Sequence, residues 1–190
     1  MKLIIPLFFI LIFFRPENKD KIVYIQPLGN VEIKYMDHVK KTLNNFYGYK
    51  CIVNPRVNLT NDLLSKSKKR YDGLKILKKF NTNRNILIIT EKDITTKKGN
   101  IDEWGVLGLG FRPGTVCVVS TFRMKRDANE KKILDRLKKV SIHEVGHNMG
   151  LDHCKNDIKC MMNDAKGTIT QIDREKFYFC EKCKNQIGLK

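Results

Sequence analysis

The chain has 190 residues, of which 42% are hydrophobic, so it is long enough for one core and short for two domains. Its 37 basic and 20 acidic residues give a net charge of +17, which would attract nucleic acid, anionic membranes or acidic proteins. The lysines are spread along the chain, mostly as pairs, without a dense basic run with interleaved aromatic residues. We therefore expect a solvated basic surface and no specific nucleic-acid partner.

The first 15 residues read MKLIIPLFFILIFFR and predict a targeting segment. Lys2 precedes an unbroken apolar run from Leu3 to Phe14, which is shorter than the about 20 residues of a transmembrane helix. No pair of small residues marks a cleavage site, so a signal peptide and an uncleaved membrane anchor both stay open. We expect an exported or membrane-tethered protein, with a cytoplasmic protein as the alternative.

Three short runs rich in β-branched or other apolar residues predict strands, at residues 21–26, 49–53 and 85–90. Between the first two runs, apolar residues recur at helical spacing from Ile33 to Phe46. We expect Asn30 to cap this helix and Gly48 to end it. The mixture of strands and helices indicates a fold of the α/β (α+β) class.

The stretch from residue 56 to residue 102 has weaker patterns. Residues 56–67 are polar and predict an irregular connection. Residues 71–80 predict a helix that turns Leu74 and Leu77 inward, with Ile76 and Phe80 as further candidates for its inner face. The lysine- and glycine-bearing residues 94–102 predict a loop.

Two further strands are predicted at residues 104–111 and 115–121, on either side of a turn at residues 112–114. Either strand could form a sheet edge that accepts an extended peptide by strand addition. The glycines of the first strand would let a substrate backbone come close: Gly105, Gly108 and Gly110. A hairpin without a ligand is the alternative.

A long helix is predicted from Asp127 to about Met149, since Asp127-x-x-Glu130 resembles a capping box. Its core-facing side carries Leu134, Leu137, Ser141 and Val145. A different side carries His143, Glu144 and His147, which we expect to face a cleft.

The motif His143-Glu144-x-x-His147 has the spacing of a metal site. Residues four apart on a helix lie one turn apart on the same face, so both imidazoles can bind one ion. Gly150 suits a left-handed exit from the helix, and His153 follows as a third ligand. Three nitrogen ligands leave one position of a zinc ion open for water or substrate, as catalysis requires.

Four cysteines follow the histidine motif: Cys154, Cys160, Cys180 and Cys183. The last two have the C-x-x-C spacing of a zinc knuckle, and the first two can complete a tetrahedral site of four sulfurs. Such a site is closed and therefore structural. The sequence thus predicts two zinc ions, one catalytic and one that ties the segment after His153 to the C-terminus.

The run from His143 to Cys183 resembles the archaemetzincin family, whose pattern is HExxHxxGxxxC, a second cysteine, x, Met, seventeen residues and CxxC. Here Met162 follows Cys160 by two positions, and residues 163–179 separate it from Cys180. Five residues separate Cys154 from Cys160, one more than we expect for the family. The resemblance places Met162 at the Met-turn, the methionine under the metal site of metzincins.

The resemblance implies a compact, metzincin-like single domain over residues 20–190, with a small mixed β-sheet, an active-site helix and a zinc-stapled C-terminal part. The expected reaction is peptide-bond hydrolysis by a zinc-activated water, with Glu144 as general base. The partner is then a peptide or protein substrate, and we expect a monomer. The alternative is a non-catalytic, zinc-bound module that binds peptides or nucleic acid.

Three other chemically distinctive residues lie outside the motif. Cys51 and Cys117 have apolar, strand-like surroundings and are interpreted as small buried side chains, with a disulfide between them as the alternative. His38 lies among polar residues in the first predicted helix and is interpreted as a surface residue.

Overall fold

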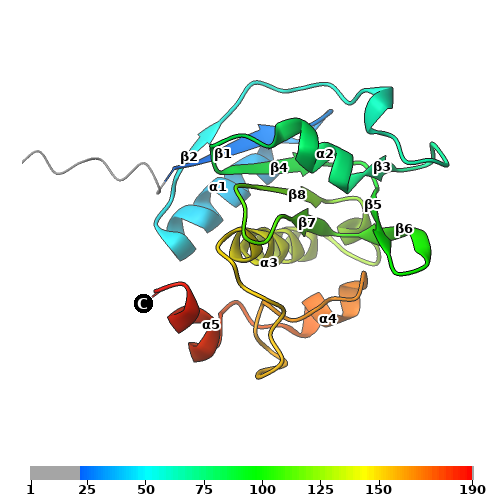
Figure 1. Ribbon diagram of the computed structural model, residues 1–190. Coiled ribbons are helices and arrows are strands. Elements are labelled where there is room, and N and C mark those ends of the chain that lie inside the picture. Colours follow the sequence, from blue (N-terminus) through cyan, green and yellow to red (C-terminus); the bar gives the residue numbers. More distant parts are fainter. Residues whose placement is uncertain (1–21, 190) are drawn as a thin grey trace, which may run out of the picture.

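A computed structural model describes residues 22–189 and is built on a five-stranded mixed sheet (Figure 1). The strand order is β2–β1–β4–β8–β7. Four strands run parallel to one another: β1 (Ile22–Pro27), β2 (Lys50–Val53), β4 (Ile86–Thr90) and β8 (Val116–Ser120). The fifth strand, β7 (Gly108–Gly110), pairs antiparallel with β8 and forms one edge. The predicted mixed α/β class is confirmed.

Helices cover both faces of this sheet. On one face α1 (Ile33–Tyr47) and α3 (Glu130–Asn148) pack with Leu87 and Ile89 of β4. On the other face α2 (Gly73–Phe80) packs with Ile86 and Ile88 of the same strand. Because successive side chains of a strand point to opposite faces, β4 and its neighbour β8 are buried throughout and read as continuous apolar runs.

A second, three-stranded sheet has the order β3–β5–β6 and contains β3 (Tyr71–Asp72), β5 (Ile94–Lys98) and β6 (Ile101–Val106). The predicted loop over residues 94–102 was wrong, since β5 and β6 form an antiparallel hairpin there. Only Ile94 and Thr95 of β5 are buried, so the strand has little apolar pattern. Pairing with β3 and β6 stabilises it instead.

The predicted strand over residues 104–111 is divided between the two sheets. Its first part belongs to β6, and Gly108–Gly110 form β7 in the large sheet. Leu107 lies between the two parts and is buried. The hairpin from β7 to β8 is confirmed, and the division lets one continuous segment join both sheets beside α3.

Two predicted helix starts were wrong. The carbonyl oxygen of the Asn30 amide accepts a hydrogen bond from Arg56, and α1 begins three residues later without a side-chain cap. Asn129, and not Asp127, caps α3 by accepting the backbone N–H of Lys132 at 3.0 Å. Several Asp and Asn residues near a helix start can serve as caps, and tertiary packing decides which of them does.

For α2, the inward prediction is confirmed for Leu77 and for the candidate Ile76, and it is wrong for Leu74. Asp72 caps this helix, which begins at Gly73. Ile76 and Leu77 are buried, whereas Leu74 is 40% exposed. Residues 56–67, predicted to be irregular, contain the short 3-10 turn Asn61–Leu63, and a second one, Arg123–Lys125, precedes α3.

The C-terminal segment, from residue 150 onward, packs on α3 from the side opposite the sheet, so α3 lies between the two (Figure 1). It carries two short helices, α4 (Ile169–Arg174) and α5 (Glu181–Gln186). Arg136 of α3 is 1% exposed and is held by both carboxylate oxygens of Asp173 at 2.8 Å. It also donates to the carbonyls of Met124 and Arg126. This ion pair, buried at its arginine, joins α4 to the central helix.

The two remaining cysteines are free and buried, as predicted, and do not form a disulfide. Cys51 lies on β2 and Cys117 on β8, with β1 and β4 between them. Three strand spacings place the two residues roughly 14 Å apart, far beyond disulfide reach. His38 is half-buried rather than on the surface.

The predicted targeting segment, residues 1–15, lies outside the described residues and stays a prediction. Among residues 22–189, no helix has the length and apolar character needed to cross a membrane.

Candidate active site and cysteine cluster

The three histidines of the sequence motif meet in one place. His143 and His147 lie one turn apart on α3, and their ring centroids are 4.5 Å apart. The ring of His153 lies 5.3 Å from His143 and 4.9 Å from His147. Each offers one ring nitrogen, and these nitrogens lie within 4.8 Å of one another. Three convergent imidazole nitrogens fit the donor set of a zinc ion.

Backbone carbonyls orient the two helical histidines. The Nδ1–H of His143 donates to the carbonyl of Met161 at 2.6 Å, and that of His147 to the carbonyl of Leu151 at 2.7 Å. A carbonyl can only accept, so these contacts put the proton on Nδ1 and leave Nε2 free for a metal. Burial lowers the pKa of His143 to about 3 and the pKa of His147 to about 4. Both rings are therefore neutral ligands at physiological pH.

His153 reaches the other two rings through a tight turn after α3. Gly150 has φ +95°, the left-handed conformation that the motif predicted for it. Its N–H donates to the carbonyl of His147 at 2.8 Å. On the other side of the turn, Asp152 forms an ion pair with Arg112 at 2.6 Å, which links the third histidine's loop to the β7–β8 hairpin.

Glu144 lies against β7 and is 6% exposed. A Cβ atom placed on Gly108 would lie 2.4 Å from its Oε1, so only glycine fits there. Gly105 in turn makes room for the guanidinium of Arg123. The sequence suggested that these glycines admit a substrate backbone, but the protein's own side chains fill the space. Burial raises the pKa of Glu144 to about 8.

Replacing Gly108 by alanine is expected to displace the Glu144 carboxylate and to lower kcat of the peptide hydrolysis that the resemblance implies about 10- to 100-fold, with zinc retained. The matched control is Gly48→Ala, at φ +71° with open space around it. That variant strains the end of α1 by about 1 kcal/mol and should leave kcat unchanged. Steady-state kinetics on both variants check this, and an unaffected kcat for Gly108→Ala would contradict it.

The four cysteines converge in a second cluster on the far side of the His153 loop. The Sγ–Sγ distances are 3.7 Å for Cys154–Cys180, 3.9 Å for Cys160–Cys183 and 3.6 Å for Cys180–Cys183. A tetrahedron with Zn–S bonds of about 2.3 Å has edges of about 3.8 Å, which matches these distances. They are too long for disulfides, and all four thiols are free. The cluster therefore fits a closed zinc site.

Met162 lies beneath the histidine helix and is fully buried. A Cβ atom on Gly146 would lie 2.7 Å from the sulfur of Met162, so the methionine touches α3 between His143 and His147. The carbonyl of Met162 accepts the N–H of Cys154 at 2.7 Å. The methionine segment thus contacts both the histidine helix and the cysteine cluster.

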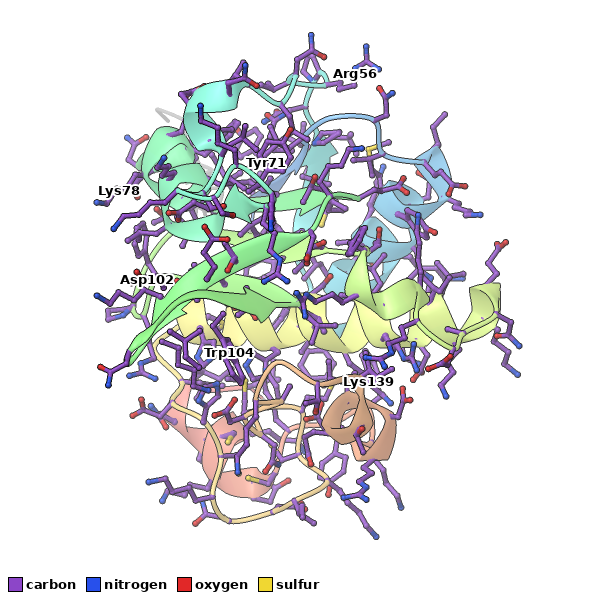
Figure 2. All side chains as sticks on the ribbon, turned by 90° about the vertical axis from the view of Figure 1, so that its right-hand side faces the viewer. Arg56, Tyr71, Lys78, Asp102, Trp104 and Lys139 are labelled. Carbon is purple, nitrogen blue, oxygen red and sulfur yellow. The ribbon has the colours of Figure 1, made fainter. Side chains whose placement is uncertain are left out.

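A cleft of about 440 Å³ runs along α3 past the three histidines and Glu144. Residues 104–110 of β6 and β7 form its upper wall, and residues 163–167 of the C-terminal segment form its lower wall. The Lys98–Asp164 ion pair, at 3.8 Å, connects β5, which pairs with β6, to the lower wall. Figure 2 shows Trp104 on the side of α3 that also faces the C-terminal segment.

Comparison with known proteins connects this arrangement to a family. The model of peptidase family M54 matches residues 20–188, which is nearly the whole chain. The chain belongs to peptidase family M54. It is 28% identical over 165 residues to the archaemetzincin of Archaeoglobus fulgidus, covering 87% of this chain and 98% of that protein. The archaemetzincin of Methanocaldococcus jannaschii is 27% identical over 171 residues, covering 87% and 92%.

Solved structures of the M54 family show the same fold. The archaemetzincin of Archaeoglobus fulgidus, crystallised with malonate, superposes with a TM-score of 0.78 at 28% identity, covering 87% of this chain and 99% of that one. The archaemetzincin of Methanopyrus kandleri superposes with a TM-score of 0.76 at 23% identity, covering 92% of this chain and 97% of that one. The resemblance to archaemetzincins is thus confirmed. The chain is a zinc metallopeptidase of the metzincin type, with donor sets for a catalytic and a structural zinc.

The two donor sets of this M54 peptidase are expected to respond differently to pH. Burial raises the pKa of Cys160 to about 11, and burial also raises the pKa of Cys183. Zinc must displace at least the protons of these two thiols, so the zinc affinity of the cysteine site should fall by at least about 100-fold per pH unit on acidification from pH 8 to pH 6. At the histidine site, His143 and His147 are already neutral in that range, so zinc displaces at most the proton of Glu144. The zinc affinity of the histidine site should therefore fall by no more than about tenfold per pH unit.

Competition with a chelator at pH 6, 7 and 8 measures both slopes. A His143→Ala, His147→Ala variant reports the cysteine site alone, and a Cys180→Ser, Cys183→Ser variant reports the histidine site alone. Equal slopes for the two variants would contradict the prediction.

Sequence reasoning missed several residues that shape the site. The carbonyls of Met161 and Leu151 orient the histidines, and Gly146 makes room for Met162. Gly108 was singled out from the sequence, but its role in making room for Glu144 was missed. The Asn148 amide, at the end of α3, donates to two carbonyls of the β7–β8 hairpin. Gly146 lies inside the HExxH motif, where a glycine within a helix is a readable signal of close packing. The carbonyls have no sequence signal.

Proposed function

We propose that the chain hydrolyses peptide bonds with zinc bound by His143, His147 and His153, and with Glu144 as general base. The observation that carries this proposal is the set of three convergent imidazole nitrogens, two of them held in the Nδ1–H tautomer, beside a buried carboxylate. A purely structural histidine site would have no need of Glu144 or of a cleft beside it.

In this reaction Glu144 takes a proton from the attacking water and delivers it to the leaving amine. Contact with Gly108 holds its carboxylate next to the histidines. When bound, zinc supplies a Lewis acid that activates water and polarises a carbonyl, and its positive charge favours ionised Glu144. The buried histidines stay neutral and orient the ion through Nε2.

The substrate class that the M54 family implies is peptides. We propose that the backbone of the peptide pairs with β7, the edge strand of the large sheet. Support comes from the position of β7, whose residues Gly108 to Gly110 line the cleft above Glu144. The main-chain hydrogen bonds of an added strand would position any sequence, so side-chain selectivity must come from elsewhere in the cleft.

We propose that the cysteine cluster holds a structural zinc and that Met162 supports the catalytic site from below. Cys154 directly follows His153, so a zinc bound to the cluster restrains the loop that carries the third histidine. Met162 contacts α3 at Gly146, between the two helical histidines. The cluster would then act on catalysis through the position of His153.

The test is zinc per chain by elemental analysis, together with hydrolysis of a peptide library, for the wild type and a His143→Ala, His147→Ala variant. We expect two zinc ions and turnover in the wild type, and one zinc ion without turnover in the variant. One zinc ion in both proteins would mean that only the cysteine cluster binds metal. The chain would then be a non-catalytic zinc-bound binding module.

A further inference from the structure

The cleft extends beyond the metal-binding histidines to an end lined by Lys139, Val140, Ile172 and Glu175. Lys139 lies on α3 four residues before His143, which corresponds to about 6 Å along the helix axis. In Figure 2 the labelled side chain of Lys139 lies between α3 and α4. A long side chain of a peptide whose scissile bond lies at the histidines can reach this end.

Glu175 is the unusual residue at this end of the cleft. It follows directly after α4 and is 6% exposed. Within residues 22–189, its side chain has a single hydrogen bond, from Nε2 of Gln171 at 3.4 Å. A carboxylate has about four acceptor positions, so most of its hydrogen-bonding capacity is unused. Burial raises the pKa of Glu175 to about 8 and outweighs the hydrogen bond from Gln171 and the charge of Lys139, which both lower it.

The other charged group at this end is already satisfied. Lys139 is 6% exposed, and its ammonium forms an ion pair with Asp135 at 2.8 Å. It also donates to the backbone carbonyl of Ile172 at 3.1 Å. Lys139 therefore has Asp135, which it shares with Lys138, as its direct ion-pair partner. Within residues 22–189, Glu175 lines the cleft without a direct ion pair of its own.

Resting on the proposed peptidase function, we propose that Glu175 selects a lysine or arginine side chain on a substrate residue next to the scissile bond. The apolar parts of Val140 and Ile172 would pack along the methylene groups of that side chain. Its cationic head would meet the Glu175 carboxylate in a charge-assisted hydrogen bond, out of contact with bulk water. An acidic side chain would find no cationic partner at Glu175 and would lose its hydration on entering this end of the cleft, so it is disfavoured.

Paired peptides that differ only in lysine, norleucine or glutamate at each position flanking the cleaved bond test this proposal. The zinc-loaded full chain should cleave the lysine peptide with a kcat/KM at least about tenfold above that of the norleucine peptide, at one flanking position. Glu175→Gln should remove this preference and keep the norleucine rate. The control Glu130→Gln, at an ion-paired exposed carboxylate of α3, should leave the preference intact.

Binding measurements separate this proposal from the peptidase function itself. The Glu144→Gln protein should bind the lysine peptide at least about tenfold more tightly than the norleucine peptide, and the added Glu175→Gln change should equalise the two affinities. Cleavage without a lysine or arginine preference, or a preference that survives Glu175→Gln, overturns the selectivity proposal and leaves the peptidase function standing. Lysine-selective binding by the Glu144→Gln protein, without any cleavage by the wild type, supports the selectivity proposal and overturns the proposed peptidase function.

Two further outcomes also decide the proposal. If Glu175→Gln fails to fold, as judged by circular dichroism and zinc content, the wild-type preference decides by itself. If the Glu144→Gln protein binds neither peptide and the wild type cleaves neither, the proposal is overturned together with the proposed function.

Discussion

Glu144→Gln is expected to keep both zinc ions and to lower kcat of peptide hydrolysis by a factor of about 10² to 10⁴. Glutamine has the same shape as glutamate and fills the space against Gly108, so the cleft keeps its form. It cannot take a proton from water, so the general-base step is lost. Zinc per chain and steady-state hydrolysis of a cleaved library peptide, measured on the same preparation, give both halves of the result.

The matched control for this loss is Glu130→Gln on the same helix. Glu130 is exposed and pairs with Lys34 at 3.2 Å, so its replacement should leave kcat and zinc content unchanged. Full activity of Glu144→Gln would mean that a different group accepts the proton. Loss of the histidine-bound zinc would instead show that Glu144 stabilises the metal site.

Replacing Cys183 by serine is expected to release the cysteine-bound zinc and to unfold the C-terminal segment locally. Cys183 is 5% exposed, and its sulfur lies 3.6 Å from that of Cys180. Structural zinc contributes folding free energy directly, so the loss should amount to several kcal/mol, on the order of half the apparent binding free energy of such sites. Because Cys154 adjoins His153, hydrolysis should fall as well.

Urea denaturation and zinc analysis check the effect of Cys183→Ser. Cys51→Ala is the control, since Cys51 is a buried free cysteine on β2, outside the cluster. It should cost about 1 kcal/mol and leave two zinc ions per chain. If Cys183→Ser also kept two zinc ions and full stability, the cluster would not be a metal site.

Much of the histidine site was predictable because its geometry is local. His143 and His147 are four residues apart on one helix, and helical periodicity alone puts them on one face. Gly150 has the left-handed conformation that its place in the motif predicts, which brings His153 to the other two rings. The C-x-x-C spacing likewise holds Cys180 and Cys183 together at the start of α5.

The surroundings of the site were not predictable, because they depend on segments far apart in the chain. Gly108 contacts Glu144, which lies 36 positions later, and no local pattern connects the two residues. The division of residues 104–111 between two sheets depends on which partner strand each half finds. The starts of α1 and α3 were misplaced because several nearby residues are suitable caps.

By itself, the sequence determined the family, the two sets of zinc donors and the mixed α/β class, because regular spacing and burial patterns are properties of short segments. Only the tertiary structure decided how Glu144 is held, how the histidine tautomers are set, and that Glu175 lies unpaired at the end of the cleft. These features come from contacts between α3, β7 and the C-terminal segment, which meet only when the chain folds. The metal-binding residues were therefore readable from the sequence, whereas the proposed selectivity had to be inferred from the fold.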